Sequence, residues 1–316
     1  LQEVLKTYHG IVSFKADESL DDGHKIVSTV LFTKEYAFEN EEEKEMFELS
    51  GGKSRHQYSH QLTFDFTGTS PCHPHNLNAN ISIIYSAILY VLRLLVNKNI
   101  PLNEGLMQGV KVILPDNSFL HPHFSDDPAQ CPAVVGGNTE VSQRLVDTLL
   151  KAFQSAACSQ GTMNNFLFGN GQFGYYETIC GGTGASAEAN GRSAVHQHMT
   201  NTRITDAEEL ERRYPIQLNR FAIREGSGGN GRRTGGDGVI REVTFLEPLR
   251  VTLITQHRVV PPYGMQGGQN GQPGSQTLFR KNGDVETLAG ICSVEVEAGD
   301  SLRIETPGGG GFGKLI

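Results

Sequence analysis

The sequence predicts an α+β fold: a helix-containing N-terminal portion with a mixed sheet, followed by a β-rich C-terminal portion, either sandwich-like or barrel-like. Helix and strand patterns alternate up to residue 215, and from residue 216 only short strands bounded by Gly, Pro or Asn follow. The 37 glycines divide in a similar way, with 9 before residue 161 and 28 from Gly161 onward. We therefore expect an α+β domain over residues 1–215 and a β-rich domain over residues 216–316.

The composition excludes several classes of protein. Of the 316 residues, 37% are hydrophobic, which is enough for a folded core, and the glycines have no G-x-y period. The longest apolar run, residues 81–96, is shorter than the roughly 20 residues that a membrane span needs. The net charge is −8, and 12 acids against five lysines in the first fifty residues account for most of it. We expect no nucleic-acid partner and no membrane association.

The cysteines and the N-terminus indicate a location. The five cysteines are odd in number, scattered and without a C-x-x-C pair, so neither a disulfide framework nor a zinc knuckle is indicated. A reducing, cytoplasmic location fits this pattern. The chain has no initial Met and no signal peptide, and Leu1–Lys6 reads as a helix turn. We expect it to be a fragment of a longer polypeptide.

Core helices are expected near residues 80–97, 139–157 and 206–213. The first is apolar nearly all round, and the second has apolar residues at Val141, Leu145 and Leu149, which share one face. The third begins with Thr205-Asp-Ala-Glu208, a capping-box pattern, and ends before Pro215.

Strands surround these helices. The acidic stretch Glu39–Glu48 is interpreted as a solvated loop or short helix rather than a binding tail. The expected N-terminal strands are Gly10–Phe14, Lys25–Thr33, Gln61–Phe66 and Val110–Leu114; those of the C-terminal portion are Ile216–Ile223, Val239–Phe245, Arg250–Thr255, Gln276–Phe279, Ser293–Val296 and Ser301–Glu305.

Two glycine clusters resemble nucleotide-binding fingerprints. Residues 226–231 match G-x-G-x-x-G and residues 182–187 match its looser form, but no helix is expected after either one to hold a pyrophosphate. The chain also has no P-loop sequence. We interpret the glycines as turn positions that need a positive φ, and we expect no nucleotide site here.

Histidine pairs and a cysteine were considered for metal binding and nucleophilic chemistry. The H-x-H pairs are His73/His75, His121/His123 and His196/His198, and on a strand such pairs face the same way. Their spacing identifies no third ligand, so we assign no metal ligand in this chain. There is no G-x-S-x-G motif, and Cys158 at a helix end reads as a small buried thiol.

Residues 161–206 combine many polar side chains with glycine-rich turns, as a site for a small polar substrate would. A satisfied structural polar network would give the same composition, and both interpretations stay open. The polar residues are Asn164, Asn165, Tyr175, Tyr176, Glu177, His196, His198, Asn201, Arg203 and Asp206.

Several motifs in this order resemble the hydantoinase B/oxoprolinase family, from about Leu20 to the end of the chain. The ending Thr306–Gly313 is similar to that of the 5-oxoprolinase branch. The motifs are Gly136-Gly-Asn-Thr-Glu-Val-Ser-Gln-Arg144, Ser159-Gln-Gly-Thr-Met-Asn-Asn165, Tyr175-Tyr-Glu-Thr178 with Gly181-Gly182, His198-Met-Thr-Asn-Thr-Arg-Ile-Thr-Asp206, and Gly226-Ser-Gly-Gly with Gly235-Gly-Asp-Gly238.

This resemblance implies ATP-dependent opening of a cyclic amide, either 5-oxoproline or a hydantoin. A hydantoinase A-type subunit or domain would bind ATP and Mg and phosphorylate the lactam oxygen, and the B part would complete the hydrolysis. The family's upstream motif, Asn-Asp-Pro with Gly-Gly-Thr-His-x-x-Asp, is missing here, and it supplies metal ligands in carboxylase relatives. We therefore expect the C-terminal part of a B unit, in an oligomer, inactive alone, with any divalent metal in the upstream half.

Within these motifs we assign candidate roles. Glu177 or His196/His198 would transfer protons, Asn164 and Asn165 would bind the amide, and Arg203 would hold a substrate carboxylate, with Asp206 also in the substrate site.

Two other functions stay open: a subunit of an ATP-dependent ketone carboxylase, and a scaffold without catalytic residues. If Asn164, Glu177, His198 and Arg203 cluster around one cleft, the scaffold is disfavoured. Dispersal of the four residues would favour it.

Overall fold

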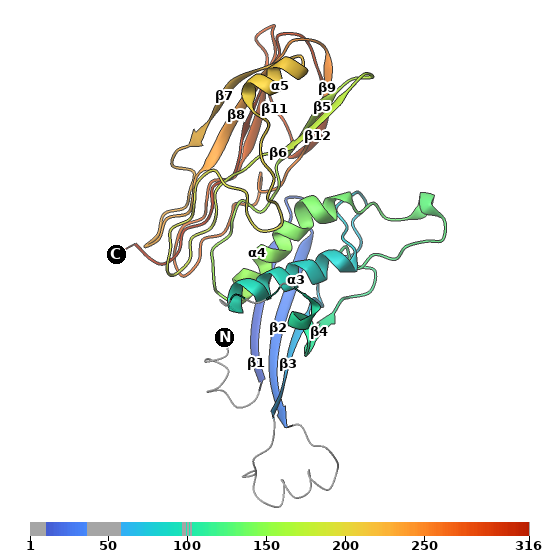
Figure 1. Ribbon diagram of the computed structural model, residues 1–316, viewed down its shortest axis with the longest axis vertical. Helices are drawn as coiled ribbons and strands as arrows, with labels where there is room; N and C mark the ends of the chain where they lie inside the picture. The colour runs from blue at the N-terminus through green and yellow to red at the C-terminus, as the bar shows by residue number, and fades with distance from the viewer. Residues whose placement is uncertain (1–10, 37–57, 97–98, 100, 102, 316) are drawn as a thin grey trace, which may run out of the picture.

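The computed structural model describes residues 11–36, 58–96, 99, 101 and 103–315 (Figure 1). The helix turn expected at Leu1–Lys6 and the acidic stretch Glu39–Glu48 lie outside these residues. The described chain has an N-terminal layer of sheet and helices and a C-terminal pair of sheets, so the expected α+β class is confirmed.

The N-terminal sheet is mixed, as predicted. Its order is β1-β2-β3-β4, in which the first three strands are antiparallel and β4 runs parallel to β3. The parallel pairing follows from the long crossover between β3 and β4, which carries a helix. The strands are β1 (Ile11–Ser19), β2 (Lys25–Tyr36), β3 (Tyr58–Asp65) and β4 (Val110–Ile113).

Two helices, α3 (Ile81–Val96) and α4 (Ser142–Ala152), lie across one face of this sheet (Figure 1). They share a core with the sheet, in which Val30 and Phe64 meet Ile88 and Leu145. Helix α3 is less buried than its composition suggested, because Tyr85 and other apolar residues on its outer side are exposed.

Helix α4 is shorter than predicted. A π-helical turn, η3 (Gly137–Val141), precedes it, and it ends at Ala152 rather than Ala157. Gln154 adopts a left-handed φ of 52°, which stops the helix and turns the chain away. Short 3₁₀ turns lie elsewhere in this portion, at η1 (Glu104–Met107) and η2 (Pro128–Gln130).

The C-terminal portion is a sandwich of two antiparallel sheets around a second core. One sheet has the order β11-β10-β13-β8-β7 and the other β12-β9-β5-β6. The strands are β5 (Asn165–Gly169), β6 (Gly174–Thr178), β7 (Ile216–Arg224), β8 (Gly238–Phe245), β9 (Leu249–Ile254), β10 (Ser275–Phe279), β11 (Val285–Thr287), β12 (Ile291–Val296) and β13 (Ser301–Glu305).

The pairing of β5 and β6 shifts the expected boundary at residue 215. Both strands belong to the four-stranded sheet of the sandwich, with Asn165 opposite Ile254 and Phe168 opposite Val251. Phe166 and Phe168 are buried in the second core. The β-rich portion therefore includes residues 165–178, which the sequence analysis assigned to the α+β domain because polar and glycine residues obscure the alternating phenylalanines.

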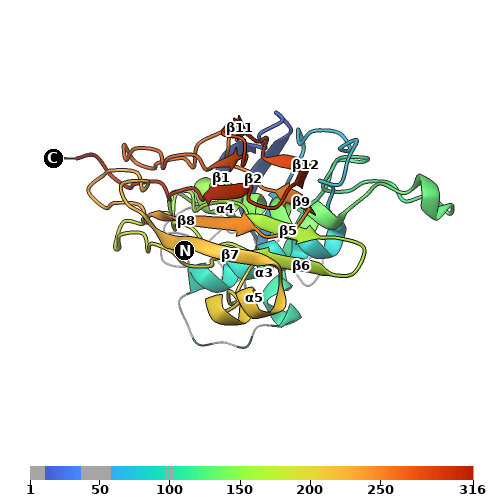
Figure 2. The same ribbon diagram turned by 90° about the horizontal axis from the view of Figure 1, so that it is seen from above.

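Helix α5 (Ala207–Arg213) lies beside β7, outside the sandwich (Figure 2), and its Leu210 packs into the second core. Its N-cap is Asp206 rather than the predicted Thr205, since the Asp206 carboxylate accepts from the amides of Glu208 and Glu209. Thr205 instead accepts a hydrogen bond from Tyr175.

The glycine-rich segments between the strands form an array of extended chains joined by backbone hydrogen bonds, running side by side in Figure 1. The amide of Gly236 donates to Thr183 (2.9 Å) and that of Gly309 donates to Gly236 (2.8 Å). A Cβ on Gly309 would lie 1.9 Å from the Thr183 carbonyl oxygen. Close backbone approach explains glycine at Gly236 and Gly309, whereas Gly226 has the expected positive φ of 78°. No helix follows either fingerprint.

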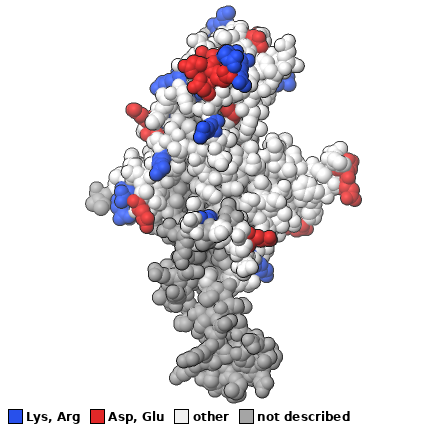
Figure 3. Space-filling model, in the orientation of Figure 1, with Lys and Arg blue, Asp and Glu red and all other residues white. Residues whose placement is uncertain are grey.

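The described part of the face in Figure 3 carries scattered charges of both signs, which gather together over α5. There Glu209 pairs with Arg212 and Arg213. Among the described residues, no helix has the length and apolar character that crossing a membrane requires.

Candidate active site

A pocket of about 780 Å³ lies where α3 and the end of α4 meet the glycine-rich segments. His196 and His198 both line it. Each also borders a different smaller pocket of about 330 Å³. The other walls of the larger pocket come from Tyr90, Leu94, Leu95, Leu150, Ser155, Ala156, Ser159, Thr183, Gly184, Ser186, Arg192, Val195, Gln197 and Thr200.

His198 links a buried carboxylate to a pocket hydroxyl. Its Nε2 lies 3.2 Å from Oδ1 of Asp147, and its Nδ1 lies 3.3 Å from the Tyr90 hydroxyl. An ionised carboxylate only accepts hydrogen bonds, so Nε2 carries the ring proton and Nδ1 accepts from Tyr90. His198 also has a left-handed φ of 57°, an uncommon backbone state that concentrates at functional sites.

The carboxylate of Asp147 is positioned by its neighbours. Its side chain is 0% exposed, and Oδ1 also accepts from the Ser159 amide (3.1 Å). The Tyr263 hydroxyl donates to the Asp147 backbone oxygen (2.6 Å). Oδ2 has no hydrogen-bond partner among the described residues. Burial, with the charge of Asp147, raises the pKa of Tyr90, so its phenol is protonated near neutral pH.

His196, two residues before His198, has a different environment. Burial lowers its pKa, so the imidazole is neutral near pH 7. Its Nε2 lies 3.5 Å from the Thr202 hydroxyl, and its Nδ1 is buried without a partner among the described residues. The pocket therefore contains two imidazoles, of which only His198 contacts a carboxylate.

Behind the pocket, Cys158 belongs to a buried and unreactive group. Its Sγ lies 3.5 Å from Nε2 of His257, which also accepts from Arg144 at 2.5 Å. Burial raises the pKa of Cys158 and lowers that of His257, so both are neutral and no thiolate forms. The predicted buried thiol is confirmed, although α4 ends six residues before it.

The structure does not bring the other predicted site residues to this pocket. Glu177 lies inside the sandwich, where both of its oxygens bind Arg241, at 2.6 and 3.1 Å, and one accepts from Tyr175. No carboxylate oxygen of Glu177 stays free for a substrate proton. Arg203 is exposed and lines none of the pockets described here.

The two asparagines are buried in structural contacts. Asn164 donates to Gln160 (2.7 Å) and to the Ile179 carbonyl, whereas Asn165 donates to Glu140 and to the Ile254 carbonyl, both at 2.7 Å. Neither lines the pocket, and Asp206 is engaged as the cap of α5. Of the seven predicted residues, the structure brings together only His196 and His198.

A family model described as hydantoinase B/oxoprolinase matches residues 11–315. The chain belongs to the hydantoinase B/oxoprolinase family. This confirms the resemblance that the sequence motifs indicated.

Known relatives of this hydantoinase B/oxoprolinase chain are much longer. It is 51% identical over 256 residues to 5-oxoprolinase 1 of Arabidopsis thaliana, an alignment that covers 81% of the chain but 20% of the relative. The chain thus spans about a fifth of that relative's length.

Two solved structures share the fold. The ATP-dependent caprolactamase from Pseudomonas jessenii has a TM-score of 0.74 and 21% identity, covering 99% of this chain and 53% of that one. Nucleotide-free acetone carboxylase has a TM-score of 0.71 and 15% identity, covering 99% and 46%. At these identities the likeness is one of fold alone.

Sequence reasoning missed three residues that line the pocket of this hydantoinase B/oxoprolinase chain, Tyr90, Ser159 and Arg192, and also the buried Asp147 that contacts His198. Asp147 is the only carboxylate of helix α4, but a carboxylate in an amphipathic helix does not by itself indicate a site. Ser159 opens one of the family motifs. Tyr90 had no signal, since an aromatic residue in an apolar helix reads as core. Arg192 is exposed at the pocket and forms no ion pair with a described residue.

Proposed function

We propose that this chain is the ring-opening part of an ATP-dependent cyclic-amide hydrolase, acting on a lactam such as 5-oxoproline after its oxygen has been phosphorylated. The observation that carries the proposal is the Asp147–His198–Tyr90 chain at the wall of the pocket. The names of relatives support the reaction class, since 5-oxoprolinase and ATP-dependent caprolactamase both denote enzymes that act on lactams.

The geometry supports a proton relay. Water attacks the activated carbonyl carbon and gives a proton to the Tyr90 oxygen, while the Tyr90 proton passes to Nδ1 of His198. The imidazolium that forms is stabilised by Asp147. As the C–N bond of the lactam breaks, the same path in reverse returns the proton to the lactam nitrogen. A second water then hydrolyses the acyl phosphate that remains, which gives the carboxylate and inorganic phosphate. His196 stays in the proposal as a neutral imidazole at the same pocket.

The substrate carboxylate needs a cation, and we assign it to Arg192 in place of Arg203. Arg192 lines the pocket and forms no ion pair with a described residue, whereas Arg203 lines none of the described pockets. A guanidinium at this position can bind a carboxylate through two hydrogen bonds. Replacing Arg192 with Ala should raise KM for 5-oxoproline about tenfold or more, and Arg203→Ala is the matched control that leaves KM unchanged.

ATP and Mg would be bound by a hydantoinase A-type partner, in a cytoplasmic oligomer. All five cysteines are free, which suits a reducing compartment. A divalent metal ligated by the upstream half of the B unit is also part of this proposal.

The experiment that tests the proposal uses the parent enzyme with its ATP-binding partner. Tyr90→Phe removes only the terminal hydroxyl of the relay and should lower kcat for ring opening about 100-fold. ADP formation from ATP should fall less, because phosphorylation takes place elsewhere. Tyr85→Phe, at an exposed position on the same helix, is the control. A Tyr90→Phe enzyme with more than half of the wild-type kcat would exclude the relay.

One observation favours the scaffold alternative. Asn164, Glu177 and Arg203 are dispersed, and of the four residues named for that test only His198 lines the pocket. If this chain is a scaffold, Tyr90→Phe and Arg192→Ala should leave kcat and KM at wild-type values in the assembled enzyme. The same two variants therefore distinguish a ring-opening role of this chain from a scaffold role.

A further inference from the structure

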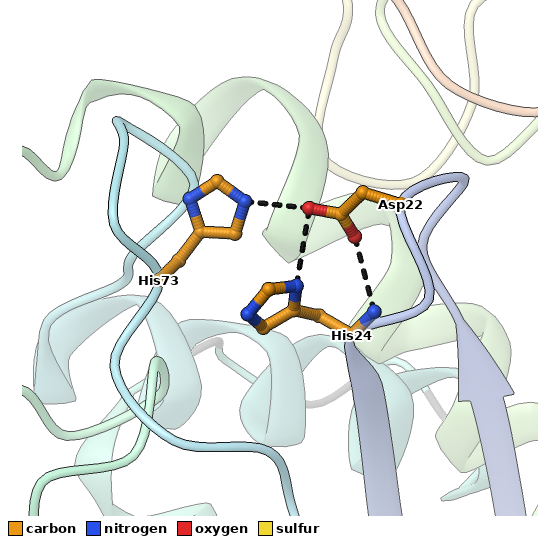
Figure 4. A group of neighbouring side chains, drawn as sticks. All are labelled: Asp22, His24 and His73. Atoms are coloured by element: carbon orange, nitrogen blue, oxygen red, sulfur yellow. Dashed lines mark hydrogen bonds and ion pairs between the residues drawn. The ribbon is translucent and has the colours of Figure 1, made fainter.

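A group of three potential metal ligands lies away from the pocket, where the turn between β1 and β2 meets the loop that precedes α3 (Figure 4). Asp22 and His24 come from the turn, and His73 comes from the loop. One ligand atom from each lies within 4.8 Å of the others. None of the three lines the pockets described above.

Two imidazole nitrogens converge on a single carboxylate oxygen. Oδ2 of Asp22 lies 2.6 Å from Nε2 of His73 and 3.1 Å from Nδ1 of His24. Both rings therefore direct a nitrogen toward one point, as Figure 4 shows. A cation held about 2.1 Å from each nitrogen would lie near that point, with the carboxylate drawn back to become the third ligand.

We propose that Asp22, His24 and His73 bind a divalent transition-metal cation of the zinc class. Two histidines and one carboxylate suit such cations better than Ca²⁺ or Mg²⁺, which prefer oxygen ligands alone. The side chain of Asp22 is 39% exposed, so it can rotate to admit the ion, and a fourth position stays open to solvent. This proposal does not depend on the function of the pocket.

The surrounding structure holds His73 in place. Its side chain is 4% exposed, and its backbone is fixed by Asn78, which accepts from the His73 amide (2.7 Å) and donates to the His73 carbonyl (2.9 Å). The turn is also anchored, because the Asp21 carboxylate accepts from the amides of Arg258 (2.7 Å) and Val260 (3.0 Å). A ligand set on two anchored segments is preorganised for binding.

One contact opposes the cation. The His75 amide donates to Nδ1 of His73 (3.0 Å), so without a metal the ring proton of His73 is on Nε2 and is donated to Asp22. A cation at Nε2 displaces that proton, the ring then carries its proton on Nδ1, and the His75 amide must turn away. We therefore expect the cation to bind with micromolar rather than nanomolar affinity, and we expect its binding to change the NMR signal of the His75 backbone amide.

The full 316-residue chain, purified without a polyhistidine tag and freed of metal with a chelator, is titrated with Zn²⁺ by calorimetry. We expect one site per chain with a Kd on the order of 10 µM or below. Asp22→Asn and His24→Ala, both at solvent-accessible positions, should each weaken binding about tenfold or more. Replacement of the buried His73 is avoided because it endangers folding.

His75→Ala is the matched control, since His75 belongs to the same H-x-H pair but lies outside the ligand group. It should leave Kd unchanged. Zn²⁺ should also raise Tm by several degrees in the wild type but not in Asp22→Asn. The proposal is overturned if the wild type does not bind Zn²⁺, if Asp22→Asn and His24→Ala bind as the wild type does, or if His75→Ala weakens binding equally.

Discussion

Glu177 in the sandwich and Asp147 beneath the pocket are both buried carboxylates, but they are surrounded differently. Glu177 has a guanidinium on both oxygens and a tyrosine hydroxyl besides. Asp147 has a histidine and one amide on Oδ1, and Oδ2 has no partner among the described residues. A fully paired carboxylate stabilises a core, whereas a partly paired carboxylate beside a pocket can still stabilise a proton on a neighbouring imidazole. Burial alone therefore does not distinguish a structural from a catalytic carboxylate.

The largest expected effect on the free energy of unfolding comes from replacing the paired carboxylate, Glu177. Glu177→Gln leaves the Arg241 guanidinium, whose side chain is 1% exposed, without a counter-charge. Removing one partner of a buried ion pair costs about 3–5 kcal/mol, so we expect a loss of this size in the free energy of unfolding measured with urea.

The double variant Glu177→Leu/Arg241→Met is the control for Glu177→Gln, because it replaces both charged side chains with apolar ones of similar volume. It should recover most of the loss. If Glu177→Gln unfolds at the wild-type urea concentration, the pair contributes nothing and the comparison with Asp147 fails.

Asp147→Asn should show the opposite pattern. The amide keeps the shape but no longer stabilises an imidazolium on His198, so kcat of the parent enzyme should fall about 100-fold. The free energy of unfolding should change by less than about 1 kcal/mol, because a partly unpaired buried charge is removed at the same time. A large loss of stability with unchanged kcat would make Asp147 a structural residue like Glu177.

The sequence could distinguish neither carboxylate from the other. Glu177 was selected because it stands in a polar stretch, yet its partner Arg241 comes from β8, 64 residues later, and only strand pairing brings the two together. Asp147 was passed over because a carboxylate in an amphipathic helix is ordinary until its neighbours are known. His196 and His198 were found because both belong to a local motif, which a sequence does reveal.

The fold was easier to predict than the site. Alternation and glycine turns identified most strands, and the apolar pattern identified α3 and α4. Strands β5 and β6 were missed because β5 joins the sheet through β9, about 80 residues away in the chain, and β6 pairs only with β5. The short alternation of Phe166 and Phe168 is weak on its own. Array glycines such as Gly309 were misread as turn positions, because close approach of two backbones depends on contacts between distant segments.

The array also forms part of the pocket wall, which gives the third prediction. An alanine at Gly309 places Cβ 1.9 Å from the carbonyl oxygen of Thr183, a residue that lines the pocket. We expect a loss of about 2 kcal/mol in the free energy of unfolding, with KM of the parent enzyme raised as the wall shifts.

Gly171→Ala is the control, since nothing lies within 4 Å of its added Cβ and its φ is not positive. It should change stability by less than about 0.5 kcal/mol. Equal effects of the two substitutions would mean that backbone packing does not explain the glycines.

Glu140 is a third buried carboxylate, intermediate between the other two, and it gives the smallest effect. Burial raises its pKa from 4.5 to about 8, and Oε2 has no partner among the described residues although Asn165 donates to Oε1. The folded state therefore holds this proton more tightly than the unfolded state. The stability that Glu140 contributes is full below about pH 4.5 and is lost as pH rises toward 8.

Glu140→Gln cannot titrate, so the wild type should lose stability relative to this variant as pH rises from 5 to 8, by at most about 1.4 kcal/mol per pH unit. Urea unfolding of both proteins at several pH values measures the difference. The exposed Glu225→Gln serves as the control, with a difference from wild type that stays constant across the range. A constant difference for Glu140→Gln as well would mean that Glu140 is ionised throughout, and its environment would then resemble that of the paired Glu177 rather than that of a carboxyl group kept neutral by burial.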